Sequence, residues 1–240
     1  AMAKSEEIGN ALIVQGEYWS LITIYLVGGA LDQAEQVADK LYAMRKDFVP
    51  TFSTFFLASI AWVKVALGKL REGEAILEQA FEDFDREGSY RFAMAPLFVA
   101  DGHLQLALGN PERTLDRMKD VIQRLHHVGS RYYLAEALWL QGKAWLALNN
   151  VEQAKEALRE AKAVAEDNNE RTILWQILAT LSDLEKMSGN EPEAEKLRGQ
   201  AQEILVYIAD HTGSEALRAS FLAQPAVREL REKRAGVTVL

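Results

Sequence analysis

Four histidines are the side chains best suited to binding a metal or moving a proton, but their spacing favours neither role. They are His103, His126, His127 and His211. The chain has no His-Glu-x-x-His motif, and on a helix the adjacent pair would point about 100° apart. It also has no cysteine, which excludes disulfides, thiolate catalysis and cysteine-ligated zinc. We therefore expect neither a metal nor another cofactor.

Other motifs for catalysis are also missing. The pairs Gly68-Lys69 and Gly142-Lys143 lack the upstream glycine and the following Ser or Thr of a phosphate-binding loop. No Gly-x-Ser-x-Gly sequence exists to present a nucleophile. The four-residue spacing of Glu74, Glu78 and Glu82 is typical of a solvated helix face. We expect a protein that is not an enzyme.

Composition favours a soluble, mostly helical protein. The 240 residues carry a net charge of −8, with 49% hydrophobic and 26% charged residues and only five prolines. This charge argues against binding nucleic acid or an acidic membrane through bulk charge. The most apolar stretch, residues 48–67, has Lys64 as its single charge. Because it includes several Ser and Thr residues and falls on the repeat described next, it is interpreted as a buried helix.

A pair of small residues, five positions apart, returns five times along the chain. The spacings between successive pairs are 39, 41, 40 and 40 residues, and the pairs are Gly29/Ala34, Gly68/Gly73, Gly109/Thr114, Asn149/Ala154 and Gly189/Ala194. A period of this length is the signature of an array of helical repeats. The Gly or Asn that opens each pair suits the left-handed conformation that ends a helix, so each unit is predicted to be two helices joined at that turn.

Further small residues recur at fixed distances from each turn. Seven positions before it stand Ala61, Gly102, Gly142 and Ser182, with Ile22 in the first repeat, and twelve positions after it stand Ala80, Val121, Ala161 and Ala201, with Leu41 in the first repeat. Small side chains at these places let two helices approach closely. The pattern therefore predicts close helix packing and no cofactor-binding motif.

This ladder of small residues resembles the tetratricopeptide repeat (TPR). The copy that matches best has Leu138, Gly142, Trp145, Asn149, Ala154, Leu158 and Ala161 in the corresponding places. The common repeat has 34 residues, and the extra residues here predict about one more helical turn or a longer connection. The resemblance implies an all-α, right-handed superhelical solenoid of about five antiparallel helix pairs. HEAT or armadillo repeats, which share the period but not the ladder, are the alternative.

Repeats of this length resemble those in the regulatory regions of bacterial signalling ATPases. These include maltose-regulator-like transcription activators and multidomain nucleotide cyclases, whose regions end in a segment similar to residues 217–230. We expect residues 1–3 to be a cloning remnant, 4–212 to form five helix pairs, 213–234 to cap them and 235–240 to be a flexible tail. The first predicted helix, residues 8–27, is apolar almost all round. A terminal repeat helix should have a polar face, so we expect the C-terminal arm of a longer protein.

One row of side chains is a candidate for ligand binding. In TPR arrays the first helix of each pair lines the concave surface, and the resemblance carries this over to Trp62, His103, Glu136, Trp139, Lys143, Gln176 and Asp183. Packing does not require such a mixture of tryptophan, charge and amide. The alternative is that the tryptophans pack between repeats and the polar residues only meet water.

A second row consists of arginines one repeat apart. Arg91, Arg131 and Arg171 each stand near the start of a first helix. Three guanidinium groups on one edge could bind carboxylates or phosphates of a partner. Alternatively each could pair with an acid at the end of the preceding helix, such as Glu87 for the first of them and Glu166 or Asp167 for the last.

The sequence as a whole therefore indicates an interaction or sensing module. We expect a cytoplasmic bacterial regulator whose arm binds a peptide, a protein or a small ligand on its concave face, without direct contact to nucleic acid or membrane. The alternative is a scaffold that self-associates, for instance as a homodimer, through its apolar N-terminal helices.

Overall fold

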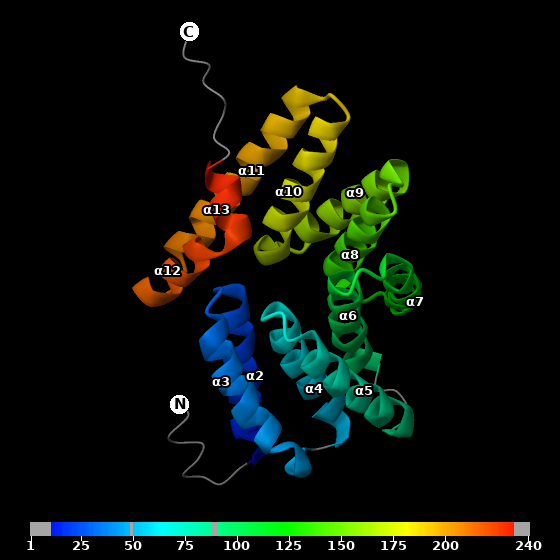
Figure 1. Cartoon of the computed structure of the whole chain (residues 1–240), viewed down its shortest axis with the longest axis vertical. Coiled ribbons are helices and arrows are strands. Elements are labelled where there is room, and N and C mark those ends of the chain that lie inside the picture. Colours follow the sequence, from blue (N-terminus) through cyan, green and yellow to red (C-terminus); the bar gives the residue numbers. More distant parts are fainter. Residues whose placement is uncertain (1–10, 49, 88–90, 233–240) are drawn as a thin grey trace. The chain divides into compact units, whose positions relative to one another are not determined.

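The structure, a computed structural model, describes residues 11–48, 50–87 and 91–232, and these fold into helices without a strand. Figure 1 shows the helices in chain order. Their bounds are α2 Ala11–Val27, α3 Leu31–Ala43, the 3-10 helix η1 Arg45–Asp47, α4 Pro50–Ala66, α5 Leu70–Glu87, α6 Arg91–Ala107, α7 Pro111–Val128, α8 Leu134–Ala147, α9 Val151–Asp167, α10 Arg171–Met187, α11 Glu191–Asp210, α12 Glu215–Ala223 and α13 Pro225–Glu232.

Helices α2 to α11 form helix pairs whose turns are those that the sequence predicts. Gly29, Gly68, Gly109, Asn149 and Gly189 all have positive φ angles, between 58° and 77°. At the second turn the Gly68 N–H donates to the Val65 carbonyl, and the next N–H donates to the Lys64 carbonyl. Equivalent bonds recur at the other four turns, as expected for a helix that ends in a left-handed residue. The interpretation of these residues as turns is confirmed.

The small residues of the ladder lie where the two helices of a pair cross. The residues twelve positions after each turn, Leu41, Ala80, Val121, Ala161 and Ala201, are fully buried. At Gly142 the approach is so close that an added Cβ would lie 2.6 Å from Leu158 Cγ of α9. In the last pair the Ser182 hydroxyl donates to the Ala194 carbonyl at 2.7 Å. The predicted role in close packing is confirmed.

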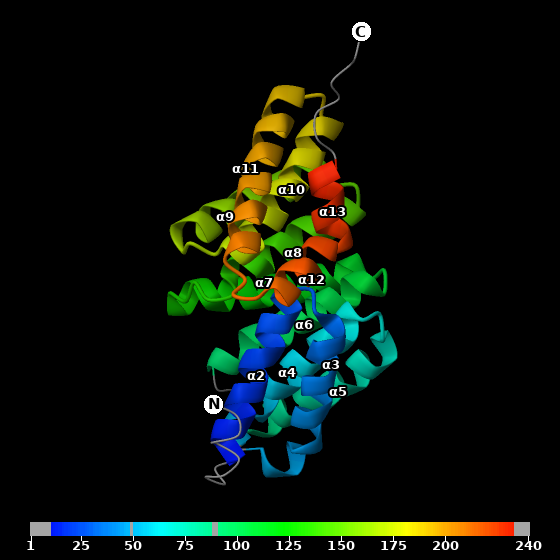
Figure 2. The same cartoon turned by 90° about the vertical axis from the view of Figure 1, so that its left-hand side faces the viewer.

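The chain divides into two compact units, residues 1–125 and 126–240, with the boundary inside α7. The first unit contains α2 to α6 and most of α7, and the second contains α8 to α13. In the second unit α10 and α11 run side by side (Figures 1 and 2) and bury Leu178, Leu181, Ala194 and Leu197 among others. Each unit thus has an apolar core built by neighbouring helix pairs.

The most apolar stretch of the sequence is a buried helix, as predicted. It forms α4, in which Leu57, Ile60, Ala61 and Val63 are fully buried. No helix among the described residues is long and apolar enough to cross a membrane. Lys64, the single charged residue of α4, is buried as well.

Helix α2 keeps the all-round apolar character that its sequence shows. Val14, Tyr18 and Ile22 are buried, and α2 packs on α3 and α4. Large apolar side chains also stand on its outer face: Leu12, Ile13, Ile24 and Val27 are between 40% and 49% exposed. The first residues of the predicted helix, 8–10, lie outside the described residues.

Two short helices follow the last pair. Phe221 of α12 and Val227 and Leu230 of α13 are buried, and both helices pack on α11. The Gln202 amide of α11 donates to the Leu230 carbonyl at 2.7 Å. The segment therefore covers apolar surface of the last pair up to residue 232. Residues 1–3 and 235–240, expected to be a remnant and a tail, lie outside the described residues.

Candidate ligand-binding site

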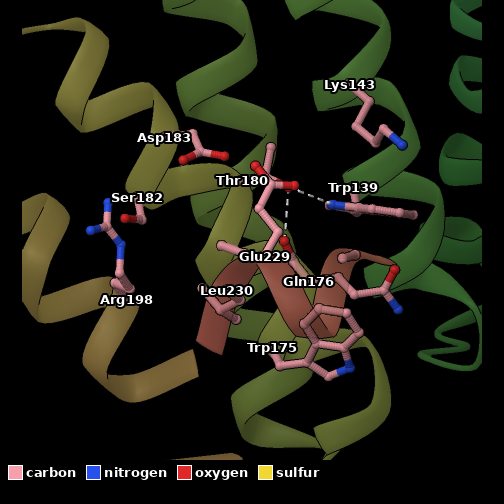
Figure 3. A pocket seen from close by; sticks show the side chains of 12 residues that line it. Trp139, Lys143, Trp175, Gln176, Thr180, Ser182, Asp183, Arg198, Glu229 and Leu230 are labelled. Carbon is pink, nitrogen blue, oxygen red and sulfur yellow. Dashed lines mark hydrogen bonds between the residues drawn. The ribbon is translucent and has the colours of Figure 1, made fainter. Parts of the chain in front are cut away.

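A cavity of about 240 Å³ lies in the second unit, between helices that are far apart in the sequence (Figure 3). Helix α8 contributes Trp139 and Lys143, and α10 contributes Trp175, Gln176 and Asp183 among others. The remaining walls come from α11, through Arg198, and from α13, through Ala226, Glu229 and Leu230. Two indole rings and several polar groups thus converge on one hollow, which is the usual composition of a ligand site.

Trp139 is held in place by a hydrogen bond between two helices. Its side chain is 7% exposed, and its Nε1 donates to Thr180 Oγ1 of α10 at 3.0 Å. The same hydroxyl donates to the Gln176 carbonyl at 2.8 Å, and Figure 3 draws both bonds. Because the hydroxyl both accepts and donates, the indole has a defined orientation at the cavity wall.

Lys143 stands one helical turn after Trp139 and lies over its ring. The Nζ atom is 4.5 Å from the ring centroid, a distance at which the ring face attracts a cation. The residue is exposed to solvent, and the protein around its ammonium group lowers the pKa by desolvation. Among the described residues no carboxylate forms an ion pair with this ammonium group.

The charged groups on the other walls are separated from Lys143. Figure 3 shows Asp183 of α10 and Arg198 of α11 on the side of the cavity away from the lysine, with Glu229 of α13 between. Trp175 is almost completely buried below them and adds apolar surface. The cavity therefore has a cationic edge on α8 and a mixed, balanced edge on α10, α11 and α13.

The structure brings together four of the seven side chains in the predicted row. Trp139, Lys143, Gln176 and Asp183 line the cavity, whereas Glu136, in the first turn of α8, does not. Lys143 and Asp183 stand six residues before their turns, Trp139 ten and Gln176 thirteen. These spacings of three, four and seven residues place the side chains on one face of each first helix.

Trp62 and His103 belong to the first unit and form a contact of their own. Trp62 of α4 and His103 of α6 stack, with ring centroids 5.1 Å apart and an angle of 25° between the planes. Both residues stand six positions before their turns, the position that Lys143 and Asp183 hold in the second unit.

Sequence reasoning missed part of the cavity. Trp175 belongs to the repeat but lies outside the predicted row, and its buried neighbours Leu174 and Ile177 identify it only as core. Glu229 and Leu230 stand beyond the last repeat, where the period no longer assigns positions. Only the packing of α13 on α11 brings them to the site.

Two arginines of the row contact the end of the second helix in their own pair. Arg131 forms an ion pair of 2.8 Å with Asp167, at the end of α9. The Arg171 guanidinium lies 4.4 Å from the centroid of the Tyr207 ring, near the end of α11. Asp167 and Tyr207 each stand 36 residues after the arginine that they contact. Asp167 therefore pairs with Arg131 and not, as the alternative suggested, with Arg171, because the first helix begins beside the end of the second. Arg91 begins α6, and its side chain lies outside the described residues.

The histidines are distributed over separate surroundings. His126 Nε2 lies 3.3 Å from a Glu160 carboxylate oxygen, and His211 Nδ1 lies 2.7 Å from the Tyr207 carbonyl. Within the described ranges no group of three or more His, Asp or Glu side chains is placed to hold a metal ion.

A second hollow, of about 600 Å³, lies between α9, α10 and α11. Its cations are already paired: Lys162 with Glu166 at 2.8 Å and Lys196 with Glu193 at 3.2 Å. These contacts neutralise the surface that an anionic ligand would need. The smaller cavity is therefore the better candidate.

Several solved structures have an architecture similar to that of this chain. The peptide-bound and DNA-bound PlcR of Bacillus thuringiensis matches with a TM-score of 0.73 and 12% identity, over 87% of this chain and 75% of that one. A signal transduction ATPase of Pyrococcus horikoshii with a tetratricopeptide repeat sensor matches with a TM-score of 0.63 and 13% identity, over 88% and 32%. Aspartyl phosphate phosphatase F of Bacillus subtilis matches with a TM-score of 0.64 and 14% identity, over 95% and 62%.

The fold is tetratricopeptide-like. The chain spans less than two thirds of the ATPase and of the phosphatase. No family model and no curated protein matches its sequence. At identities of 12–14% the solved structures establish the architecture, whereas function has to be argued from the site.

Proposed function

We propose that the chain is an interaction and sensing module that binds a peptide segment in the cavity of its second unit. The observation that carries this proposal is the wall formed by Trp139, Lys143 and Trp175, because it joins two indole surfaces to a cation at one opening. Indole rings supply large contact area, and the polar groups around them would fix the orientation of a ligand. PlcR, which shares the fold, was solved in complex with a peptide.

The wider setting of the module is also part of the proposal. We place it as an arm of a larger cytoplasmic bacterial regulator of signalling or transcription. One neighbour is a signal transduction ATPase in which a tetratricopeptide repeat serves as sensor, and this chain covers 32% of it. A sensor acts by binding one arrangement of its helices better than another.

The test begins with a random peptide library displayed on phage and selected against the intact chain. Selected peptides are synthesised, and their dissociation constants are measured by isothermal titration. Replacing both cavity residues, Trp139→Ala with Lys143→Ala, should weaken binding at least about tenfold, since large aromatic and cationic side chains dominate such contacts. The matched control is Lys186→Ala with Met187→Ala, which removes a lysine and an exposed apolar side chain at the end of α10.

A second variant keeps this test valid if loss of the buried Trp139 unfolds the unit. Lys143→Ala with Gln176→Ala changes two less buried cavity residues and should leave the circular dichroism unchanged. Undiminished binding by this variant and by the first would remove the cavity as the binding site. Selected peptides that bind the control more weakly than the cavity variants would point to another surface.

The exposed apolar face of α2 favours one alternative, a scaffold that self-associates. Ile24 is 49% exposed there and Val27 is 40% exposed, and such faces mark interaction surfaces. Light scattering over a hundredfold range of concentration distinguishes the two functions. A mass that rises with concentration, and that returns to the monomer value in Ile24→Glu, would favour the scaffold.

A further inference from the structure

The cavity of the second unit has a polarity that restricts its ligand. We propose that it takes an acidic group joined to an apolar side chain, with the carboxylate at the Lys143 ammonium and the apolar side chain between Trp139 and Trp175. This inference rests on the proposed function and names the chemical class of the peptide segment. The carboxylate could belong to an aspartate or glutamate side chain or to the end of a chain.

The first step concerns the sign of the ligand's charge. The face of Trp139 that could attract a ligand cation is already covered by Lys143, whose Nζ lies 4.5 Å from the ring centroid. A second cation would meet this ammonium group at close range and be repelled. This face of Trp139 is therefore closed to a cationic ligand group, whereas an anion would be attracted to the ammonium group beside it.

The second step concerns what an anion would gain. Lys143 is held against a ring with no carboxylate of the described residues in ion-pair contact. The other charged side chains of the cavity, Asp183, Arg198 and Glu229, already have interactions of their own. A ligand carboxylate would thus meet an ammonium group that is partly desolvated and already positioned. Charge-assisted hydrogen bonds of this kind are about twice as strong as neutral ones.

The third step concerns the size of the cavity and the apolar side chain of the ligand. The cavity holds about 240 Å³, below the roughly 300–1,000 Å³ of pockets that enclose a whole drug-sized molecule. It therefore fits one or two side chains or a chain end, with the rest of the peptide outside. Trp175, Ala179 and Leu230 supply apolar lining next to the cationic edge. A single apolar side chain beside a carboxylate fits this shape and this division of polarity.

The experiment uses the whole chain and four acetylated pentapeptides. The first is Ala-Ala-Ala-Ala-Leu with a free carboxyl end, and the second is the same peptide as its amide. The third is Ala-Ala-Glu-Leu-Ala amide, and the fourth has glutamine in place of glutamate. Binding is followed by NMR through the indole N–H signals of Trp139 and Trp175 and through the side-chain signals of Lys143. The first two peptides test a terminal carboxylate and the last two test a side-chain carboxylate.

We expect at least one charged peptide to bind about tenfold more tightly than its uncharged partner. Lys143→Gln should abolish this difference, Lys143→Arg should retain it, and Lys186→Gln, on the exposed surface of α10, should leave it unchanged. Equal affinities within both pairs would overturn the inference while leaving the proposed function in place. Failure of all four peptides to shift these signals would also overturn it, and the library selection then decides the proposed function independently.

Discussion

Lys64 of α4 and Glu185 of α10 occupy the same place in their repeats, four residues before the turn, and carry opposite charges in the same kind of contact. Lys64 Nζ lies 2.6 Å from Glu35 and 2.8 Å from Asp39 of α3. Glu185 Oε1 lies 3.2 Å from Lys155 and 3.5 Å from Arg159 of α9.

The partners of these two residues are equivalent as well. In both repeats they stand six and ten residues after the preceding turn. Both central side chains are 7% exposed. In each unit, one buried side chain at this position therefore joins consecutive repeats by ion pairs, and the polarity of these pairs is reversed between the units.

Removing the charge of Glu185 should destabilise the second unit. In Glu185→Gln, Lys155 would lose its acidic partner in a mostly buried place, and we expect a loss of about 1–2 kcal/mol in the free energy of unfolding. Urea unfolding followed by circular dichroism measures it. Glu195→Gln, on the exposed face of α11, is the control and should change stability by less than about 0.5 kcal/mol. Equal changes in the free energy of unfolding would show that the ion pairs of Glu185 do not stabilise the fold.

The same ion pair should make stability depend on pH. Burial opposes the charge of Glu185, but the Asn190 amide and the Lys155 ammonium outweigh it and lower the pKa of this carboxyl below its ordinary 4.5. A group with a lowered folded-state pKa stabilises the fold above the ordinary pKa and loses this effect as pH falls through the lowered value. The stability difference between wild type and Glu185→Gln should be full at pH 6–7 and shrink below about pH 4.5. Unfolding curves at pH 7, 5, 4 and 3 test this, and a constant difference would contradict it.

The helix crossing at Gly142 should not tolerate an added methyl group. A Cβ there would lie 2.6 Å from Leu158 Cγ and 2.8 Å from its Cδ2, so Gly142→Ala should cost about 1–2 kcal/mol despite the better helix propensity of alanine. Gly199→Ala is the matched control, because Gly199 lies inside α11 with nothing within 4 Å of its added Cβ. That change should stabilise by about 0.5–1 kcal/mol. Thermal unfolding of both variants tests this. If both changes raise the stability, or both lower it, the argument from the helix crossing is wrong.

The hydroxyl of Thr180 should be needed to hold Trp139 in place. Thr180→Val keeps the shape but removes the acceptor of the indole N–H, which should cost about 1–2 kcal/mol. It should also shift the indole signal of Trp139 and speed its hydrogen exchange. Thr172→Val, at the exposed start of α10, is the control. An unchanged indole signal in Thr180→Val would show that packing alone orients the ring.

The ion pair of Arg131 with Asp167 should contribute little to stability. Both side chains are more than half exposed, at 51% and 66%, and such pairs are worth about 0–1 kcal/mol. Arg131→Ala and Asp167→Ala should therefore each change the free energy of unfolding by less than about 1 kcal/mol. Urea unfolding at low and at 0.5 M salt measures this. If peptides from the library bind Arg131→Ala weakly while its stability is unchanged, the arginine takes part in binding.

Much of the helical framework could be predicted because it depends on local chemistry. The turns at Gly68 and Asn149 require a residue that accepts positive φ, and this demand recurs with the repeat. The helix crossings require a small residue in four of the five repeats, and at Gly142 the approach leaves no room for a Cβ. The period reveals both patterns. Four side chains of the cavity were found in the same way, because they stand six, ten or thirteen residues before a turn, on the face that each first helix repeats.

The residues that break the period could not be predicted. Glu229 and Leu230 reach the cavity only because α13 packs on α11 and the Leu230 carbonyl accepts a hydrogen bond from Gln202. Asp167 stands four residues before Arg171 but 36 residues after Arg131 in the sequence, and it pairs with Arg131 because of which helix ends meet.

The sequence by itself determined the helix pairs, their turns and the small residues at their crossings, because backbone conformation and close approach are decided by the residue type at each position. Only the tertiary structure decided that Lys143 lies over Trp139, that Lys64 is buried among acids, and that α13 closes one wall of the cavity. These contacts depend on which side chains the packed helices bring within a few ångströms and on the rotamers that this packing allows. Neither is encoded in a repeat of forty residues.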